Sequence, residues 1–216
     1  MGEIMSNSFL KIIKQRRSNF RFNSTPINDE QLNLVLEAGR WAPSWANTQP
    51  WRFIVIKDKE TKEKICSMVM GITNINMKDA PVCIAICVNT KEDSFHFIED
   101  GAAATQNMAL AAQSIGLGSC WLGVFSLHDE KKSTERKIKQ ILKIPDQWRL
   151  ISLLPLGIPK TKEKRSRKEL SSILDLNSFI PREEKALKLD IEKKKKPETK
   201  KFLTPSSARE IEPALV

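Results

Sequence analysis

The chain has 216 residues, of which 40% are apolar and 29% charged, and this is the composition of an ordinary globular protein long enough to bury a core. No apolar run approaches the roughly 20 residues of a membrane-spanning helix, and the N-terminal residues lack the pattern of a signal peptide. We therefore expect a cytoplasmic protein that has no contact with a membrane.

The formal net charge of +10 is concentrated toward the C-terminus. Six of the 36 basic residues lie within 160–168 and nine within 182–201, a stretch too charged to form a core. A solvated tail is the simpler interpretation, and weak binding of its lysines to polyanions such as nucleic acid is the alternative. We expect one domain over residues 1–176, a flexible basic tail over 177–216, and no specific nucleic-acid site.

Apolar periodicity predicts a mixed set of helices and strands. A first helix is expected at 8–17, and a second helix begins after Asn28 and ends near Gly39. Asn28 is a good N-cap, and Gln31 at the third helical position is typical of a capping box. The further predicted elements are strands at 52–57, 81–88, 119–125 and 149–156, and helices at 59–69, 97–115 and 130–142.

Two of these elements carry distinctive side chains. The strand "PVCIAICV" is apolar almost throughout, as expected for a strand covered on both faces. The helix at 97–115 has small side chains on several faces, which favours a central, tightly packed position or an oligomer face, and Gly116 follows it as a C′ residue. The four cysteines form no CxxC pair, so we interpret them as buried free thiols and predict no metal site.

The sequence contains no motif for side-chain catalysis. There is no phosphate-binding P-loop, and the segment 116–118 follows a helix, which is the wrong order for a dinucleotide fingerprint. An enzyme with this sequence would depend on a cofactor for its chemistry. The basic clusters at 16–18 and 165–167 offer guanidinium groups to a phosphate, although a solvated, salt-bridged helix end is the alternative for each.

Four stretches of the sequence together resemble the nitroreductase family of flavoproteins. They are "RRSNFRF", "WAPSWANTQPWRFIVI", "DGAAATQNMALAAQSIGLGSCWLGVF" and "LPLGIPK…RSRKEL", in the order and approximate spacing of that family. The resemblance covers about residues 8–175. It implies an α+β fold with a mostly antiparallel central sheet flanked by helices, and a homodimer with a helical interface and two FMN sites.

The resemblance also implies which residues hold FMN, because both subunits build each site in this family. The basic clusters bind the phosphate and ribityl end, the glycine segment passes close to the flavin, and the P-S-x-x-N-x-Q loop of the other chain contacts the isoalloxazine and ribityl. By that matching, one chain contributes Arg16, Arg17, Ser18, Arg165 and Arg167, and the other contributes Pro43, Ser44, Asn47 and Gln49. Gly116, Leu117 and Gly118 match the segment that passes close to the flavin.

The sequence departs from the family pattern at two positions. Phe20 stands where many relatives carry a basic residue, and the adjacent Arg21 is the candidate replacement. Trp45 stands where a small residue is usual, so we expect Trp45 to narrow the substrate pocket. The flanking Trp41 and Trp51 are expected to serve in packing.

The activity implied by the resemblance is that of an FMN-dependent oxidoreductase. Hydride passes from NADH or NADPH to flavin N5, and a small organic acceptor such as a nitroaromatic or quinone then takes the electrons, in a ping-pong sequence that needs no catalytic side chain. Three alternatives stay open. They are another flavoenzyme of this family, such as a reductive dehalogenase or the flavin-cleaving enzyme of cobalamin lower-ligand synthesis, a non-catalytic flavin-binding protein, and nucleic-acid association through the tail.

Overall fold

The computed structural model describes residues 8–68, 77–127, 133–161 and 165–181 of the chain. The chain divides into two compact units, Met1–Ser166 and Arg167–Val216, and the folded core belongs to the first. The predicted domain boundary at residue 176 stays a prediction. Within the described ranges, no helix is both long and apolar enough to cross a membrane.

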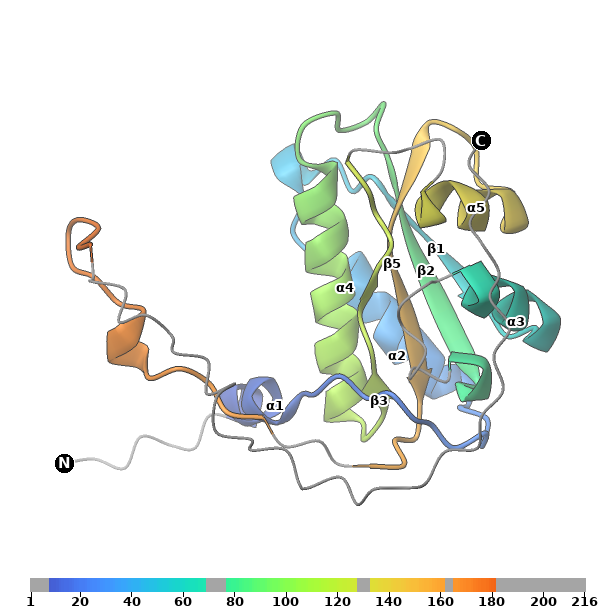
Figure 1. The fold of residues 1–216 in the computed structure, drawn as a ribbon, viewed down its shortest axis with the longest axis horizontal. Helices are drawn as coiled ribbons and strands as arrows, with labels where there is room; N and C mark the ends of the chain where they lie inside the picture. Colours follow the sequence, from blue (N-terminus) through green and yellow to red (C-terminus); the bar gives the residue numbers. More distant parts are fainter. Residues whose placement is uncertain (1–7, 69–76, 128–132, 162–164, 182–216) are drawn as a thin grey trace, which may run out of the picture. The chain divides into compact units, whose positions relative to one another are not determined.

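The first unit is built on an antiparallel sheet (Figure 1). Its strands follow the order β1-β2-β5-β3, and β4 also pairs with β5. Every pairing between strands is antiparallel, which confirms the predicted mostly antiparallel sheet. The strands are β1 (Trp51–Ile56), β2 (Val82–Asn89), β3 (Gly118–Ser119), β4 (Leu122–Gly123) and β5 (Trp148–Gly157).

Helices cover both faces of the sheet, and this buries β2 as predicted. Val82, Ile84 and Ile86 belong to one core cluster, whereas Cys83 and Cys87 point into the other. The first cluster is closed by α2 (Asp29–Arg40) and α4 (Phe97–Ser114), and the second by α3 (Lys59–Met68) and α5 (Thr134–Ile141) (Figure 1). A short N-terminal helix, α1 (Ser8–Gln15), lies against α4 and has no buried residue.

The long helix α4 is central and tightly packed, as its small side chains predicted. A Cβ atom on Gly101 would lie 2.6 Å from Ile151 Cγ1, so the helix approaches β5 more closely than a larger residue permits. Gly116 has φ = 79° and ends the helix in a Schellman motif, in which the Leu117 N–H donates to the Ala112 carbonyl over 2.9 Å.

The capping box before α2 is confirmed. The Asn28 side chain accepts the Gln31 N–H at 2.7 Å, and the Gln31 side chain accepts the Asn28 N–H at 3.2 Å. The helix α5 begins only after its N-cap, Ser133, and the earlier part of the predicted helix at 130–142 lies outside the described residues. The other main helices and strands begin and end within two residues of their predicted positions.

One prediction was wrong in detail. The single strand expected at 119–125 is divided into β3 and β4, although both pair with β5. The break lies opposite Pro155, whose nitrogen carries no hydrogen and cannot donate to the ladder, so the pairing there is reduced to the Cys120 N–H donating to the Pro155 carbonyl.

Candidate functional site

Three sequence-predicted segments meet at the C-terminal end of α4. Ser18 forms a β-bridge with Ser119, and the Asn19 N–H donates to the Ser119 carbonyl over 2.9 Å. The segment that follows β5 lies on the other side, because Phe22 bridges Pro159. We call residues 16–23, 116–119 and 157–161 the basic corner. The structure therefore brings the R-R-S cluster beside the glycine segment of the same chain.

Asn19 organises this corner, and the sequence reasoning did not single it out. The side chain is buried, and its Nδ2 donates to the Thr161 carbonyl over 3.4 Å. A Cβ atom on Gly118 would lie 2.6 Å from Asn19 Oδ1 and 3.0 Å from Pro159 Cβ. Glycine is required here for close approach, as expected, but the neighbour in this chain is Asn19. The one sequence signal that could have pointed to Asn19 is weak: it is an asparagine close to a pair of basic residues.

The two arginines of the corner have different environments. Arg17 Nη1 donates to the carbonyls of Lys14 and Arg16 at 2.6 and 2.8 Å, which satisfies carbonyl groups at the end of α1. Its Nε is buried without a hydrogen-bond partner among the described residues. Arg16 lies close enough to Cys120 to act on its thiol: burial raises the pKa of Cys120 to about 11, and the Arg16 charge opposes that rise.

The second basic cluster, residues 165–167, is exposed. Arg165 is exposed at the end of the first unit, and Arg167 is exposed in the second unit. Their convergence on the same phosphate as Arg16 stays a prediction. Arg21, the candidate replacement for the basic residue absent at Phe20, has an exposed side chain, and its carbonyl accepts the Lys160 N–H at 3.0 Å.

The predicted flavin loop, residues 43–49, has a strained backbone. Ala46, Asn47 and Gln49 have φ angles of 46°, 57° and 50°, in the left-handed region that costs a non-glycine residue about 1 kcal/mol or more. The Ser44 hydroxyl accepts the Gln49 N–H at 2.9 Å and closes the loop on itself. Asn47 and Gln49 expose their amide side chains. Strain of this kind is concentrated at ligand sites in proteins.

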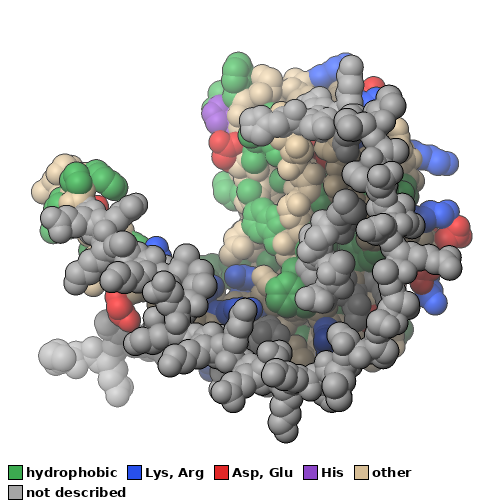
Figure 2. All heavy atoms as spheres, viewed as in Figure 1, with side chains coloured by type: hydrophobic (Ala, Val, Ile, Leu, Met, Phe, Trp, Pro, Cys, Tyr) green, Lys and Arg blue, Asp and Glu red, His purple; other side chains and the backbone are tan. Residues whose placement is uncertain are grey.

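The 43–49 loop is attached to the beginning of α4 through Trp45. The Trp45 N–H donates to Asp100 Oδ1 over 3.1 Å, and the indole stacks on His96 with ring centroids 5.2 Å apart and planes 11° apart. Half of the Trp45 surface and most of the Phe95 surface stay exposed. Figure 2 shows histidine, acidic and hydrophobic side chains together at this end of the molecule.

Two buried carboxyl groups lie beneath this contact, and sequence reasoning missed both. Asp93 and Asp100 are 3% and 4% exposed. Burial, reinforced by the neighbouring Asp93, raises the pKa of Asp100 above its ordinary value. Burial also acts on Asp93, but the N–H groups of His96 and Phe95 outweigh it and hold its pKa below the ordinary value. Acidic residues at the beginning of a helix are common, so the pattern "DSFHFIED" gave no specific signal.

Trp41 and Trp51, which flank the 43–49 loop, differ in how much of the side chain is buried. Trp51 is partly buried and packs against the core, which confirms the expectation for it. The packing role expected for Trp41 was wrong, because its side chain is 69% exposed. Trp41 is the first residue after α2, where its indole lies under the Arg40 guanidinium and donates to Glu37 over 2.6 Å.

The two halves of the predicted flavin site lie at opposite ends of α4 (Figure 1). Trp45 contacts His96 and Asp100 where the helix begins, whereas the glycine segment of the basic corner follows its last residue. The helix has 18 residues, and at 1.5 Å per residue it spans about 27 Å. The basic corner and the 43–49 loop of one chain are therefore too far apart to contact one small cofactor together.

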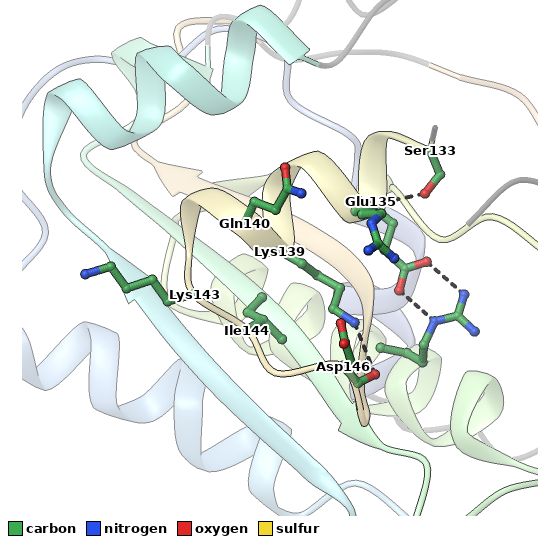
Figure 3. A pocket seen from close by; sticks show the side chains of 9 residues that line it. Ser133, Glu135, Lys139, Gln140, Lys143, Ile144 and Asp146 are labelled. Carbon is green, nitrogen blue, oxygen red and sulfur yellow. Dashed lines mark hydrogen bonds and ion pairs between the residues drawn. The ribbon is translucent and has the colours of Figure 1, made fainter. Parts of the chain in front are cut away.

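A separate cavity of about 340 Å³ lies between α5 and the beginning of β5 (Figure 3). Glu135 and Arg149 form a two-point ion pair in its wall, with both distances 2.8 Å, and the Leu150 N–H also donates to Glu135. Lys143 points away from this pair in Figure 3. None of its lining residues was predicted as a site residue, and the charged lining is unlike the flat apolar wall that a flavin ring needs.

The buried thiols offer no reactive group. Burial raises the pKa of Cys83 and of Cys87 to about 12, so both stay protonated and act as apolar core side chains. This confirms the prediction of buried free thiols for these residues and for Cys120, whereas Cys66 is only partly buried. Across the described ranges, no group of three or more His, Cys, Asp or Glu residues is arranged to hold a metal ion.

Comparison with known proteins decides the family. The model of the nitroreductase family matches residues 13–75 and 68–158, which together cover more than half of the sequence. The chain belongs to the nitroreductase family. Among its nitroreductase relatives, a protein of Archaeoglobus fulgidus provisionally named NADH dehydrogenase/NAD(P)H nitroreductase is 34% identical over 158 residues, which are 71% of this chain and 87% of that protein. A relative of the same provisional name from Methanothermobacter thermautotrophicus is 32% identical over 160 residues, 73% of this chain and 81% of the relative.

Solved nitroreductase structures share the fold. An FMN-dependent nitroreductase from Clostridium difficile superposes with a TM-score of 0.72 at 26% identity, covering 79% of this chain and 99% of that one. A protein from Desulfovibrio desulfuricans, provisionally named a nitroreductase and solved in complex with FMN, gives a TM-score of 0.68 at 29% identity, with 82% and 100% covered. The nitroreductase-like α+β fold that the resemblance implied is confirmed.

Proposed function

We propose that the chain transfers electrons from NAD(P)H to a small organic acceptor, nitroaromatic or quinone-like, by a ping-pong mechanism that uses bound FMN. Its family makes it an NAD(P)H-dependent flavin oxidoreductase with FMN as cofactor. The acceptor class and the ping-pong order are proposals. They are supported by membership of the nitroreductase family and by its relatives.

The observation that carries the proposal is an unpaired donor in the basic corner. Arg17 Nε is buried and has no partner among the described residues, and a buried N–H is rarely left without an acceptor. It lies beside Arg16 and Ser18, where a phosphate oxygen would satisfy it. The residues present therefore fit the phosphate end of FMN.

The remaining contacts follow from the same fit. Arg16 and Ser18 would hold the phosphate with Arg165 and Arg167, and the backbone at 116–118 would lie beside the flavin. Pro43, Ser44, Asn47 and Gln49 would contact the ring and ribityl from a second chain, through the exposed amides of the 43–49 loop. FMN supplies the hydride chemistry, while these residues bind it, orient it and shape the acceptor pocket.

A homodimer is part of this proposal. Within one chain the basic corner and the 43–49 loop lie at opposite ends of α4. A second copy related by a two-fold axis, with its α4 running in the opposite direction, would bring its loop to the first copy's corner and complete two equal sites.

A second candidate is another flavoenzyme of the same fold. Iodotyrosine deiodinase 1 of rat is 26% identical over 204 residues, 78% of this chain and 69% of that protein. A reductive dehalogenase is therefore kept as the alternative acceptor chemistry. Turnover of an iodinated phenol that exceeds turnover of every nitroaromatic and quinone tested would favour it.

The visible spectrum of the purified protein tests the proposal. We expect the purified protein to show the visible absorption bands of bound, oxidised FMN. These bands should bleach when NADH or NADPH is added without oxygen, and they should return when a quinone is added. A yellow protein that neither pyridine nucleotide bleaches would be a flavin-binding protein without reductase activity. A colourless protein that takes up no added FMN would contradict the cofactor assignment.

A further inference from the structure

The two buried carboxyl groups beneath the 43–49 loop, Asp93 and Asp100, accept different numbers of backbone hydrogen bonds. Asp93 Oδ1 accepts the N–H groups of Phe95 and His96 at 3.0 and 2.9 Å. Asp100 Oδ1 accepts the Trp45 N–H at 3.1 Å. The second oxygen of each group, Oδ2, is buried and accepts no hydrogen bond from another described residue. Two buried carboxylate oxygens therefore lack a donor.

A single proton held between the two carboxyl groups resolves this. Both carboxyl groups are buried, each leaves one oxygen without a donor, and each acts on the pKa of the other. The backbone donors stabilise the charged form of Asp93, and its proximity disfavours a second charge on Asp100. The protonated carboxyl of Asp100 then donates to the Asp93 carboxylate, and both groups are satisfied. Such pairs titrate as one unit rather than as two independent acids.

The 43–49 loop needs an anchor of this kind. Ala46, Asn47 and Gln49 all have positive φ angles, so the backbone would relax if it were free. The other hydrogen bonds recorded for residues 44–49 stay within the loop itself. Among the described residues, the bond from Trp45 to Asp100 is the one that joins these six residues to the helical layer, and the stacking on His96 lies beside it.

We propose that Asp100, through a proton shared with Asp93, is a positioning residue that holds the 43–49 loop in its ligand-binding conformation. The assignment of this loop to FMN rests on the proposed function. Asp100 itself is buried behind Trp45 and acts through the loop, so it is not a catalytic residue.

The stability of the 43–49 loop conformation depends on pH with a definite sign. Because the pKa of Asp100 is raised by folding, its contribution to loop stability is present below the ordinary aspartate pKa and is lost as pH rises through the raised value. The lowered pKa of Asp93 gives the opposite limit, with its contribution lost as pH falls through that value. The loop is therefore held best between these two values.

The other charged groups around the pair are few. His96 faces it from the segment before α4, with Nδ1 3.5 Å from Asp93 Oδ1. Residues 43–49 carry no charged side chain, and Glu99 on α4 is exposed. Arg149 of β5, near the beginning of α4, is paired with Glu135. Among the described residues, His96 is thus the ionisable neighbour that a test must replace.

The test uses the full chain with fluorotryptophan and follows Trp45 by fluorine NMR, with the resonance assigned by Trp45→Phe. In a His96→Gln background, we expect the Trp45 resonance to shift and broaden as pH rises through the raised pKa of Asp100, that is, at a higher pH than the ordinary aspartate pKa of about 4. Asp100→Asn keeps an oxygen acceptor for Trp45 and a donor for Asp93, so its resonance should show no shift as pH rises over the range in which the parent changes. Glu99→Gln, on the same turn, should behave as the parent.

Binding of FMN gives the second readout. Asp100→Ala should weaken FMN affinity about tenfold, the effect of one lost hydrogen bond to a buried carboxyl group, while Asp100→Asn should retain affinity and lose its pH dependence. If Asp100→Ala does not fold, Asp100→Asn alone decides the question. A pH step that persists in Asp100→Asn would overturn the proposal. If neither the parent nor any variant binds FMN, the proposed function fails. The Trp45 resonance would still test whether Asp100 positions the loop.

Discussion

The basic corner and the 43–49 loop, at the two ends of α4, are held by different kinds of interaction. The corner is fixed by main-chain contacts between segments distant in sequence, such as the Ser18–Ser119 bridge, and it presents fixed positive charge. The loop is strained and is joined to the helical layer through Trp45. A phosphate needs charge in a rigid frame, whereas a ring and a varied acceptor need adaptable contacts. The contrast predicts that substitutions in the corner affect cofactor binding most, and that substitutions in the loop affect acceptor choice as well as cofactor binding.

The largest effect is expected from removing positive charge at the corner. Arg16→Ala combined with Arg165→Ala should weaken FMN binding about a hundredfold or more, because two charge-assisted hydrogen bonds contribute about 1.5–3 kcal/mol each. Fluorescence titration with FMN measures this. Lys91→Ala with Lys137→Ala removes the same charge from exposed positions on other elements and should leave affinity unchanged. Full flavin occupancy in the double arginine variant would show that the phosphate lies elsewhere.

A smaller effect, on protein stability, is expected from the close packing at Gly118 in the basic corner. Gly118→Ala places a methyl group against Asn19 and Pro159 and should lower the free energy of unfolding by about 1–3 kcal/mol, as overpacking does. Gly123→Ala is the matched control, since a Cβ atom there meets nothing within 4 Å. Urea denaturation of both variants gives the comparison. Equal stabilities would mean that the close approach at Gly118 is not required.

The smallest effect on cofactor binding is expected at Trp45. Trp45→Ser should change the ratio of kcat/KM between a small quinone and a bulky nitroaromatic by about tenfold, a typical range for altered pocket contacts. FMN affinity should change little by comparison, because the phosphate contacts remain. Trp41→Ser is the control, since Trp41 is exposed and its ring lies under the Arg40 guanidinium. An unchanged acceptor profile in Trp45→Ser would assign Trp45 to packing alone.

Much of the fold could be predicted because local signals and tertiary packing agree. The Asn28–Gln31 capping box, the C′ glycine at Gly116 and the doubly covered strand β2 follow from residue type and spacing, and all three are confirmed. The division of β3 from β4 could not be predicted, because it depends on Pro155 in a distant strand lying opposite the break.

The candidate site was predictable only in part. The order of four motifs pointed to the corner and the loop, but the roles of Asn19 and Asp100 depend on contacts across long stretches of sequence. Asp100 is 55 residues from Trp45, and nothing in either local pattern indicates that they meet. The exposure of Trp41 was missed for the related reason that an aromatic residue beside a helix end packs inward or outward according to its neighbours.

The central claim is that each FMN site is built from the basic corner of one chain and the 43–49 loop of another. Subunit complementation tests it most directly. The Arg16→Ala, Arg165→Ala variant and an Asn47→Ala, Gln49→Ala variant, each deficient in FMN binding, are co-expressed at equal levels and purified together. Half of the dimers formed at random are hybrids with one intact site, so flavin content should recover to about a quarter of that of the parent. Flavin content no higher than in either variant alone would contradict the account.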